Sequence, residues 1–290
     1  MSAALDARFP LQQAVCTHGR VAWREAGAGP PLVLLHGIGA GALSWAGQLE
    51  GLAGTHRVIA WDAPGYGSST PLPPPQPLAL DYARALGEWL GEIGVTELVL
   101  VGHSLGALMA AAWAARADES GSKRLRSLVL ASPARGYGSA APATRLAKWQ
   151  ERIELMARLG PAGLAEQRSA ALCSGSASAT ALALVRWNMA RTTPGGYAQA
   201  AYMLAHDDLA GHLRGVHAPM HVLCGELDQT TPATACRELA AHAGAAFTLL
   251  KGVAHACYVE DAPQFNAALR NAMTTAASAQ NAGHIAKVMP

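Results

Sequence analysis

Short strand-like runs alternate with helical stretches along most of the chain. Runs rich in Val, Leu and Ile end in Gly, Asp or Ser, as buried parallel strands that lead into loops do. We predict six of them, at residues 32–35, 57–61, 97–101, 127–131, 220–224 and 247–250. Ala- and Leu-rich helices are predicted at residues 78–93, 105–117, 232–243 and 263–276. This alternation predicts an α/β fold with a mostly parallel central sheet flanked by helices.

Two further segments modify this plan. Residues 11–16 and 20–26 have the pattern of a hairpin, which would add antiparallel strands at one edge of the sheet. The alternation stops at residues 135–213, where four helices follow one another with no strand between them, at residues 144–159, 161–172, 180–191 and 197–204. We expect these helices to form a lid inserted after the sixth strand.

The predicted domain organisation follows from these segments. Residues 1–134 and 214–276 form the α/β core, residues 135–213 a helical cap, and residues 277–290 a C-terminal tail. The tail mixes Ala, Asn, Gln and Lys without a clear apolar face, so we expect part of it to be disordered. Hydrophobic residues make up 51% of the chain and charged residues 14%, which provides ample apolar surface for one large core.

Charge and local composition exclude several kinds of partner. The formal net charge is only +2, and no basic run is long enough to follow a phosphate backbone, so we expect no nucleic acid partner. Residues 1–10 lack the apolar stretch of about 7 to 15 residues that a secretory signal needs. Apolar runs elsewhere are too short to cross a membrane. We therefore expect a cytoplasmic monomer or homodimer that acts on a small-molecule substrate.

The cysteines give no sign of a metal site or a disulfide framework. All 5 are scattered, with no CxxC pair and no His at ligand spacing, so we expect reduced thiols in or near the core. The chemistry predicted below requires neither a metal nor an organic cofactor.

The pentapeptide Gly102-His103-Ser104-Leu105-Gly106 has the GxSxG pattern between a predicted strand and a predicted helix. In such a turn the residues two before and two after the serine nearly touch, which leaves room only for Gly. The serine is then held in a strained backbone conformation with its hydroxyl exposed above the sheet. This pattern predicts a nucleophile. A serine that merely caps the following helix is the alternative.

A serine hydroxyl is a poor nucleophile at neutral pH, so it requires a base and an acid that orients the base, in the chain order Ser, Asp, His. Asp228 follows the strand at residues 220–224, at the edge of the sheet where α/β sites are built. A turn or helix-capping Asp is the alternative interpretation, and Glu226 is the nearest rival acid. His255 follows the last predicted strand. We predict Ser104, Asp228 and His255 as the catalytic triad.

Attack on a carbonyl also requires two donors for the oxygen that becomes negative. We predict the backbone N–H groups of Leu105 and of Ile38, which lies in the glycine-rich loop at residues 36–41. The helical segment offers apolar and aromatic surface and no obvious cationic cluster, which predicts a medium-sized, largely apolar substrate. The residues predicted to bind it are Gly37, Trp45, His103, Trp149 and Trp187.

Together, the HG dipeptide at His36 and Gly37, the GHSLG pentapeptide, the strand-end Asp and the late His resemble the α/β-hydrolase superfamily over roughly residues 10–276. Residues 35–45 and 61–69 are similar to the branch that contains meta-cleavage product hydrolases, 3-oxoadipate enol-lactonases and small esterases. The resemblance implies an esterase or lactonase that forms an acyl-enzyme on Ser104. Two alternatives remain: a carbon-carbon bond hydrolase on the same triad, and a non-catalytic ligand-sensing protein of the same fold.

Overall fold

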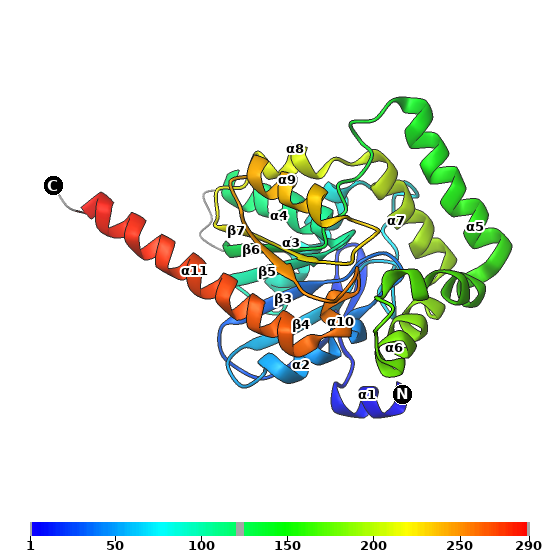
Figure 1. Cartoon of the computed structure of the whole chain (residues 1–290), viewed down its shortest axis with the longest axis horizontal. Helices are drawn as coiled ribbons and strands as arrows, with labels where there is room; N and C mark the ends of the chain where they lie inside the picture. Colours follow the sequence, from blue (N-terminus) through cyan, green and yellow to red (C-terminus); the bar gives the residue numbers. More distant parts are fainter. Residues whose placement is uncertain (1, 120–124, 289–290) are drawn as a thin grey trace.

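An eight-stranded sheet forms the centre of the protein (Figure 1). The computed structural model describes residues 2–119 and 125–288. The strand order is β1-β2-β4-β3-β5-β6-β7-β8. The strands are β1 (Gln12–Cys16), β2 (Gly19–Ala26), β3 (Pro31–Leu35), β4 (Arg57–Asp62), β5 (Leu98–His103), β6 (Leu125–Ala131), β7 (Met220–Gly225) and β8 (Ala246–Leu250). Strands β1 and β2 pair antiparallel at one edge and the others run parallel, which confirms the predicted α/β fold.

Successive residues of a strand point to opposite faces of the sheet, so a strand that is apolar throughout gives the sheet two apolar faces. Helices cover both of these faces. In β3, Val33 and Leu35 belong to one apolar core, whereas Leu32 and Leu34 belong to the other. The first core is covered by α3 (Ala79–Glu92), α4 (Gly106–Glu119) and α9 (Ala233–His242), and the second by α2 (Ala46–Leu52) and α11 (Ala262–Val288) (Figure 1). The short elements α1 (Ser2–Arg8), η1 (Ala42–Trp45) and α10 (Cys257–Glu260) were not predicted from the sequence.

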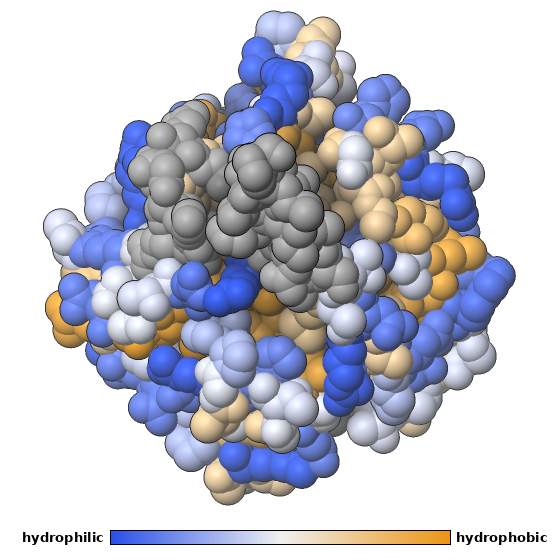
Figure 2. Space-filling view, turned by 90° about the vertical axis from the view of Figure 1, so that its left-hand side faces the viewer, coloured by the Kyte–Doolittle hydropathy of each residue, from blue (hydrophilic) through white to orange (hydrophobic). Residues whose placement is uncertain are grey.

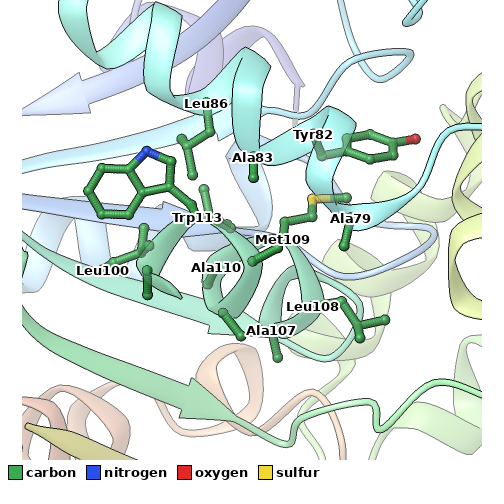
Figure 3. Packing of buried hydrophobic residues seen from close by; sticks show 14 of the residues in the cluster. Ala79, Tyr82, Ala83, Leu86, Leu100, Ala107, Leu108, Met109, Ala110 and Trp113 are labelled. Atoms are coloured by element: carbon green, nitrogen blue, oxygen red, sulfur yellow. The ribbon is translucent and has the colours of Figure 1, made fainter. Parts of the chain in front are cut away.

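Helix α4 is buried on almost every side, which fixes the turn that precedes it. Figure 3 shows Ala83 and Leu86 of α3 packed beside Met109, Ala110 and Trp113 of α4. All five side chains are buried, and the small alanines let the two helices approach closely. A helix that is apolar all round belongs to the interior of a protein. The start of α4 therefore has a rigid position relative to the sheet.

Four helices and no strand lie between β6 and β7, at the place where the sequence predicts a lid. The two helices predicted at residues 144–159 and 161–172 fall largely in one bent helix, and the short helix at residues 209–213 was not predicted. They are α5 (Pro142–Arg168), α6 (Ala179–Ala190), α7 (Pro194–His206) and α8 (Leu209–Leu213), with the short η2 (Ala170–Leu172) after α5. We call this segment, residues 142–213, the helical insertion. Helix α5 bends where Gly160 adopts φ 62° and ψ 176°, just before Pro161. That the insertion acts as a cap separate from the core stays a prediction.

The helical insertion is tied back to the core by backbone contacts. The segment that leads into it is bonded to the end of α7: Tyr137 N–H donates to the Leu204 carbonyl at 3.0 Å, and Gly138 N–H donates to the Asp207 carbonyl at 2.7 Å. At a second place, the start of α7 lies directly on the loop after β4. A Cβ atom added to Gly65 would lie 2.6 Å from the Cα atom of Gly196.

The last helix is longer than the one predicted at residues 263–276, and partial disorder of the tail stays a prediction. Helix α11 does not stop near residue 276 but continues to Val288, and residues 289–290 lie outside the described part of the chain. Ala is the strongest helix former, and Gln and Lys are also favourable. Because these residues recur along the segment, the helix that begins at Ala262 extends further than its apolar periodicity suggests.

The outer surface gives little indication of function. Seen from the left-hand side of Figure 1, small hydrophobic areas are interspersed with hydrophilic ones wherever grey atoms do not cover the face (Figure 2). Scattered apolar surface is normal for a folded domain and does not by itself indicate a binding surface. None of the described helices is both long enough and apolar enough to span a membrane.

Candidate active site

Ser104 lies in a tight turn between β5 and α4. Its φ of 51° falls in the left-handed region, which residues with a side chain rarely adopt and which costs conformational energy. A Cβ atom on Gly102 would lie 2.5 Å from the carbonyl oxygen of Gly106, and a Cβ atom on Gly106 would lie 2.5 Å from that of Leu35. The turn therefore has room only for Gly at both positions.

Backbone hydrogen bonds hold this strained turn in place. The N–H of Ser104 donates to the carbonyl of Ala131, at the end of β6, at 2.9 Å. The carbonyl of Ser104 accepts from the N–H groups of Ala107 and Ala134, each at 3.1 Å. The Ser104 side chain is thus presented at the carboxyl end of β5 by contacts to both the following helix and the neighbouring strand.

Asp228 and His255 come together from the loops after β7 and β8. The Oδ2 atom of Asp228 lies 2.9 Å from the Nδ1 atom of His255, and both side chains are buried. Oδ1 of Asp228 accepts from the backbone N–H groups of Thr230 at 2.8 Å and Thr231 at 2.9 Å, while the Thr231 hydroxyl donates to Oδ2 at 2.8 Å.

These contacts decide the charge of the carboxylate. Burial by itself raises the pKa of Asp228, but the hydrogen bonds from His255 and Thr231 outweigh burial and lower the pKa to about 2. Asp228 is therefore ionised at neutral pH and accepts a hydrogen bond from the Nδ1–H group of His255. The tautomer that results leaves the other ring nitrogen, Nε2, free to accept a proton.

His103, the residue before Ser104, contacts the backbone of His255. Its Nε2 atom lies 2.9 Å from the His255 carbonyl oxygen, and the two ring centroids are 4.9 Å apart. Because a carbonyl oxygen only accepts, Nε2 carries the proton and Nδ1 is left as an acceptor. Among the described residues Nδ1 has no hydrogen-bond partner. Burial lowers the pKa of His103 to about 3, so the ring is neutral at physiological pH.

The loop after β3 lies against the turn that holds Ser104. A Cβ atom on Gly37 would lie 3.0 Å from the Cβ atom of Ser104. The N–H of Ala40 donates to the Gly37 carbonyl at 3.2 Å, and Gly39 has a φ of 76°, so a tight turn places Ile38 at its tip. Within the described part of the chain, no internal acceptor is bound to the N–H of Ile38 or of Leu105.

A buried histidine that the sequence analysis left without a role anchors this loop. The Nε2 atom of His36 accepts from the N–H of Ala63, after β4, at 3.0 Å, and its Nδ1 atom lies 2.9 Å from the Gly37 carbonyl. Burial lowers the pKa of His36, which keeps the ring neutral and able to accept. Asp62 adds a second anchor, because its Oδ1 atom accepts from the N–H of Ala42 at 2.8 Å.

A pocket of about 520 Å³ joins these parts. Its floor includes six of the residues described above: Gly37, Ile38, His103, Ser104, Leu105 and His255. The helical insertion forms one part of its walls, through Arg152, Leu164, Arg168, Leu172, Val185, Asn188, Met189, Tyr197 and Leu204. Two of the residues predicted to bind substrate, Gly37 and His103, therefore line the pocket.

The three tryptophans predicted to bind substrate lie elsewhere, and this part of the prediction needs correction. Trp45 is fully buried in the core, with its ring 4.1 Å from that of Tyr258. Trp149 packs edge-on against Tyr202, and the guanidinium of Arg191 covers the ring of Trp187. Large rings bury most area between packed helices. The pocket is lined instead by smaller aliphatic side chains, by arginines and by three tyrosines, Tyr137, Tyr197 and Tyr258.

Three arginines in the pocket were missed by the sequence analysis: Arg135, Arg152 and Arg168. They are far apart in the sequence and form no cluster there, so composition alone carried no signal. The part of the chain that the structure describes contains no group of three or more His, Cys, Asp or Glu side chains arranged to hold a metal ion. The chemistry available in the pocket is that of a hydroxyl, a carboxylate-bound imidazole, free N–H groups and guanidinium groups.

Comparison with known proteins relates this geometry to a family. The family model for the alpha/beta hydrolase fold matches residues 30–262. A protein named as the carbamate hydrolase RutD, from Enterobacter cloacae, is 26% identical over 263 residues, which cover 85% of this chain and 92% of that protein. A thermophilic esterase from Thermogutta terrifontis has a TM-score of 0.80 at 25% identity, over 91% of this chain and 99% of that one.

Other matches are shorter. The abhydrolase domain-containing protein abhd-5.2 from Caenorhabditis elegans is 34% identical over 106 residues, which are 36% of this chain but only 23% of that protein. The family match, by contrast, covers most of the present chain, including strands β3 to β8 and the loops that carry Ser104, Asp228 and His255. This chain is thus a member of the α/β-hydrolase fold family and a hydrolase of that type.

Proposed function

We propose that this protein is a serine hydrolase that cleaves a carboxylic ester or a lactone through an acyl-enzyme on Ser104. One observation carries the proposal: Ser104, held in a strained turn, lines the same pocket as His255, whose ring is bound to the buried Asp228 at 2.9 Å. A hydroxyl, an imidazole and an ionised carboxylate in one pocket are the three groups that nucleophilic acyl transfer requires.

In the first half of the proposed reaction, His255 Nε2 takes the proton from Ser104 Oγ as Oγ attacks the substrate carbonyl. The oxygen that becomes negative accepts hydrogen bonds from the N–H groups of Ile38 and Leu105, neither of which is bound to an internal acceptor. Asp228 stabilises the positive ring of His255. The ester bond then breaks, and His255 gives the proton to the departing alcohol.

In the second half, water takes the place of the alcohol. His255 removes a proton from the water, whose oxygen attacks the acyl carbon, and the same two N–H groups stabilise the negative oxygen. When the bond to Ser104 Oγ breaks, His255 returns the proton to Oγ, and the carboxylic acid leaves. The net reaction consumes one water and one ester and forms one acid and one alcohol. For a lactone the acid and the alcohol stay on one molecule.

We further propose that the helical insertion acts as a cap that encloses the substrate. It supplies much of the pocket wall, and a volume of about 520 Å³ is suited to a medium-sized substrate. The esterase and the carbamate hydrolase to which the chain is similar are named for reactions at an acyl carbon. These names support the proposed type of reaction.

A short-chain nitrophenyl ester tests the proposal, together with the variant Ser104→Ala. We expect the wild-type protein to release nitrophenol and the variant to be at least about 10³-fold slower, because the hydroxyl is the group that forms the acyl-enzyme. A fluorophosphonate reagent should phosphonylate the Ser104 hydroxyl with release of HF, so the mass of the reagent less HF should be added to the wild-type protein and not to the variant. Equal rates for the two proteins, with matching circular dichroism spectra, would reject Ser104 as the nucleophile.

A further inference from the structure

Three arginine side chains line the pocket that contains Ser104. Arg152 and Arg168 come from α5, on either side of the bend at Gly160, and Arg135 comes from the loop after β6. Arg152 is half-buried, while Arg135 and Arg168 are exposed. The bend in α5 thus brings two arginines that are distant along one helix to the same cavity.

None of these three arginines has an acidic partner among the described residues. By contrast, six arginines of the described part of the chain form ion pairs with Asp or Glu: Arg8, Arg24, Arg57, Arg84, Arg126 and Arg186. Among the described residues, no ion pair or side-chain hydrogen bond involves the side chain of Arg135, Arg152 or Arg168. Their guanidinium groups retain their full capacity to bind an anion.

The remaining wall of the pocket does little to balance this charge. Asp208 is the only Asp or Glu among the described residues that line it. Its Oδ2 atom already accepts from the N–H of Gly211 at 3.1 Å, at the start of α8. A cavity with low-dielectric walls and an excess of one charge attracts ligands of the opposite charge. The pocket therefore favours an anionic ligand.

We infer that the substrate carries an ionised carboxylate in addition to the ester group that Ser104 attacks, and distant from it. Arg152, Arg168 and Arg135 bind this carboxylate. The inference rests on the proposed function and specifies its substrate class. A guanidinium group presents parallel N–H donors that match the two oxygens of a carboxylate. Leu164, Val185 and Met189 line the same pocket and contact the apolar part of the substrate.

A pair of esters that differ in one group tests this inference. The 4-nitrophenyl monoester of glutaric acid ends in a carboxylate, whereas 4-nitrophenyl pentanoate has the same chain length and ends in a methyl group. We expect the wild-type protein to have a kcat/KM for the glutarate monoester about 10-fold or more above that for the pentanoate, since hydrogen bonds to a charged group supply this much. Raising the salt concentration should reduce the ratio.

Variants of the arginines decide whether the pocket is the origin of that preference. Arg152→Gln should lower the ratio of the two kcat/KM values about 10-fold, and Arg168→Gln should lower it by a smaller factor. Arg158 lies on the same helix but does not line the pocket, so Arg158→Gln should leave the ratio unchanged. If Arg152→Gln does not fold, Arg168→Gln provides the same comparison.

Failure of the inference is distinguishable from failure of the proposed function. Hydrolysis of the pentanoate by wild-type protein, with no preference for the glutarate monoester, would overturn the carboxylate site and leave the serine hydrolase intact. A preference that survives in both Arg152→Gln and Arg168→Gln would also overturn it. No hydrolysis of either ester, together with no labelling of Ser104, would instead count against the proposed function.

Discussion

The Nε2 atom of His103 lies 2.9 Å from the carbonyl oxygen of His255. This contact joins the turn that holds Ser104 to the loop that holds His255. The ring of His255 is bound separately, through its Nδ1 atom, by the carboxylate of Asp228. The imidazole is therefore held both through its ring and through its backbone, and the residue next to the serine provides the second of these contacts.

We predict that His103 positions His255 and that its loss reduces kcat more than it changes KM. His103→Ala removes the donor to the His255 carbonyl and should lower kcat about 10-fold to 100-fold, because a small misplacement of a catalytic group is costly. His103→Gln is the matched control, since its amide nitrogen can reach the same carbonyl. Steady-state kinetics on a nitrophenyl ester measure both variants. A wild-type kcat in His103→Ala would show that the contact is not required.

A second prediction concerns the pH dependence of stability. The pKa of His103 is about 3 in the folded protein, because of burial, and about 6.5 in the unfolded chain. Between these values only the unfolded state binds the proton, so His103 lowers the free energy of unfolding by about 1.4 kcal/mol for each pH unit that the pH falls. Denaturant unfolding between pH 6 and pH 4.5 should give a shallower pH dependence for His103→Gln than for the wild-type protein. Parallel curves would contradict the assignment.

Asp228 gives the third prediction. Burial raises its pKa, the bonds from His255 and Thr231 lower it more, and the folded value of about 2 lies below the unfolded value of about 3.9. The ionised side chain therefore contributes about 2 kcal/mol of stability above pH 4, which is lost as the pH falls toward 2. Asp228→Asn should be less stable than wild type at pH 7 and should approach it at low pH. We also expect hydrolysis to fall about 10³-fold or more, since Asn does not orient and stabilise the His255 ring in the same way.

The contact between Gly65 and Gly196 gives a fourth prediction. A Cβ atom on Gly196 would overlap the carbonyl oxygen of Gly65, whereas nothing lies within 4 Å of a Cβ atom on Gly195. Gly196→Ala should therefore reduce the free energy of unfolding by about 1 to 3 kcal/mol. Both residues lie in the first turn of α7, where Ala favours the helix more than Gly does. Gly195→Ala should therefore leave the free energy of unfolding unchanged or increase it by up to about 1 kcal/mol. Denaturant titrations of the two variants measure the difference, and equal losses of stability in the two would argue against the backbone contact.

Much of the fold could be predicted because its causes are local. Strand and helix periodicity predicted the eight strands and the break in alternation after β6. The position of Ser104 follows from sterics, since only glycines at 102 and 106 allow the turn. Asp228 and His255 follow from topology: parallel strands end at one edge of the sheet, so residues just after β7 and β8 meet there.

The walls of the pocket could not be predicted in the same way. Helical composition predicts helices at residues 144–159 and 161–172 but not which of their faces meet the core, and the bend at Gly160 gives the two halves of α5 different directions. Trp149 packs against Tyr202 of α7 and Trp187 lies beneath the guanidinium of Arg191, while Arg152 and Arg168 reach the cavity. Short elements such as η1 were also missed, because four residues are too few to show a period.

The hydrogen bonds from Tyr137 to Leu204 and from Gly138 to Asp207 have a consequence for how such a protein changes over time. The chain enters the insertion beside the end of α7, so helices α5 to α7 begin and end at one junction, and the contact between Gly65 and Gly196 holds the start of α7 against the core. Substitutions of side chains beyond that junction can reshape the cavity while the loops after β5 and β7 keep their positions. The loop after β8 is less independent, because the N–H of Ala256 donates to the carbonyl of Leu172, in the insertion, at 2.8 Å. Selectivity and reactivity are therefore free to evolve at different rates within one polypeptide.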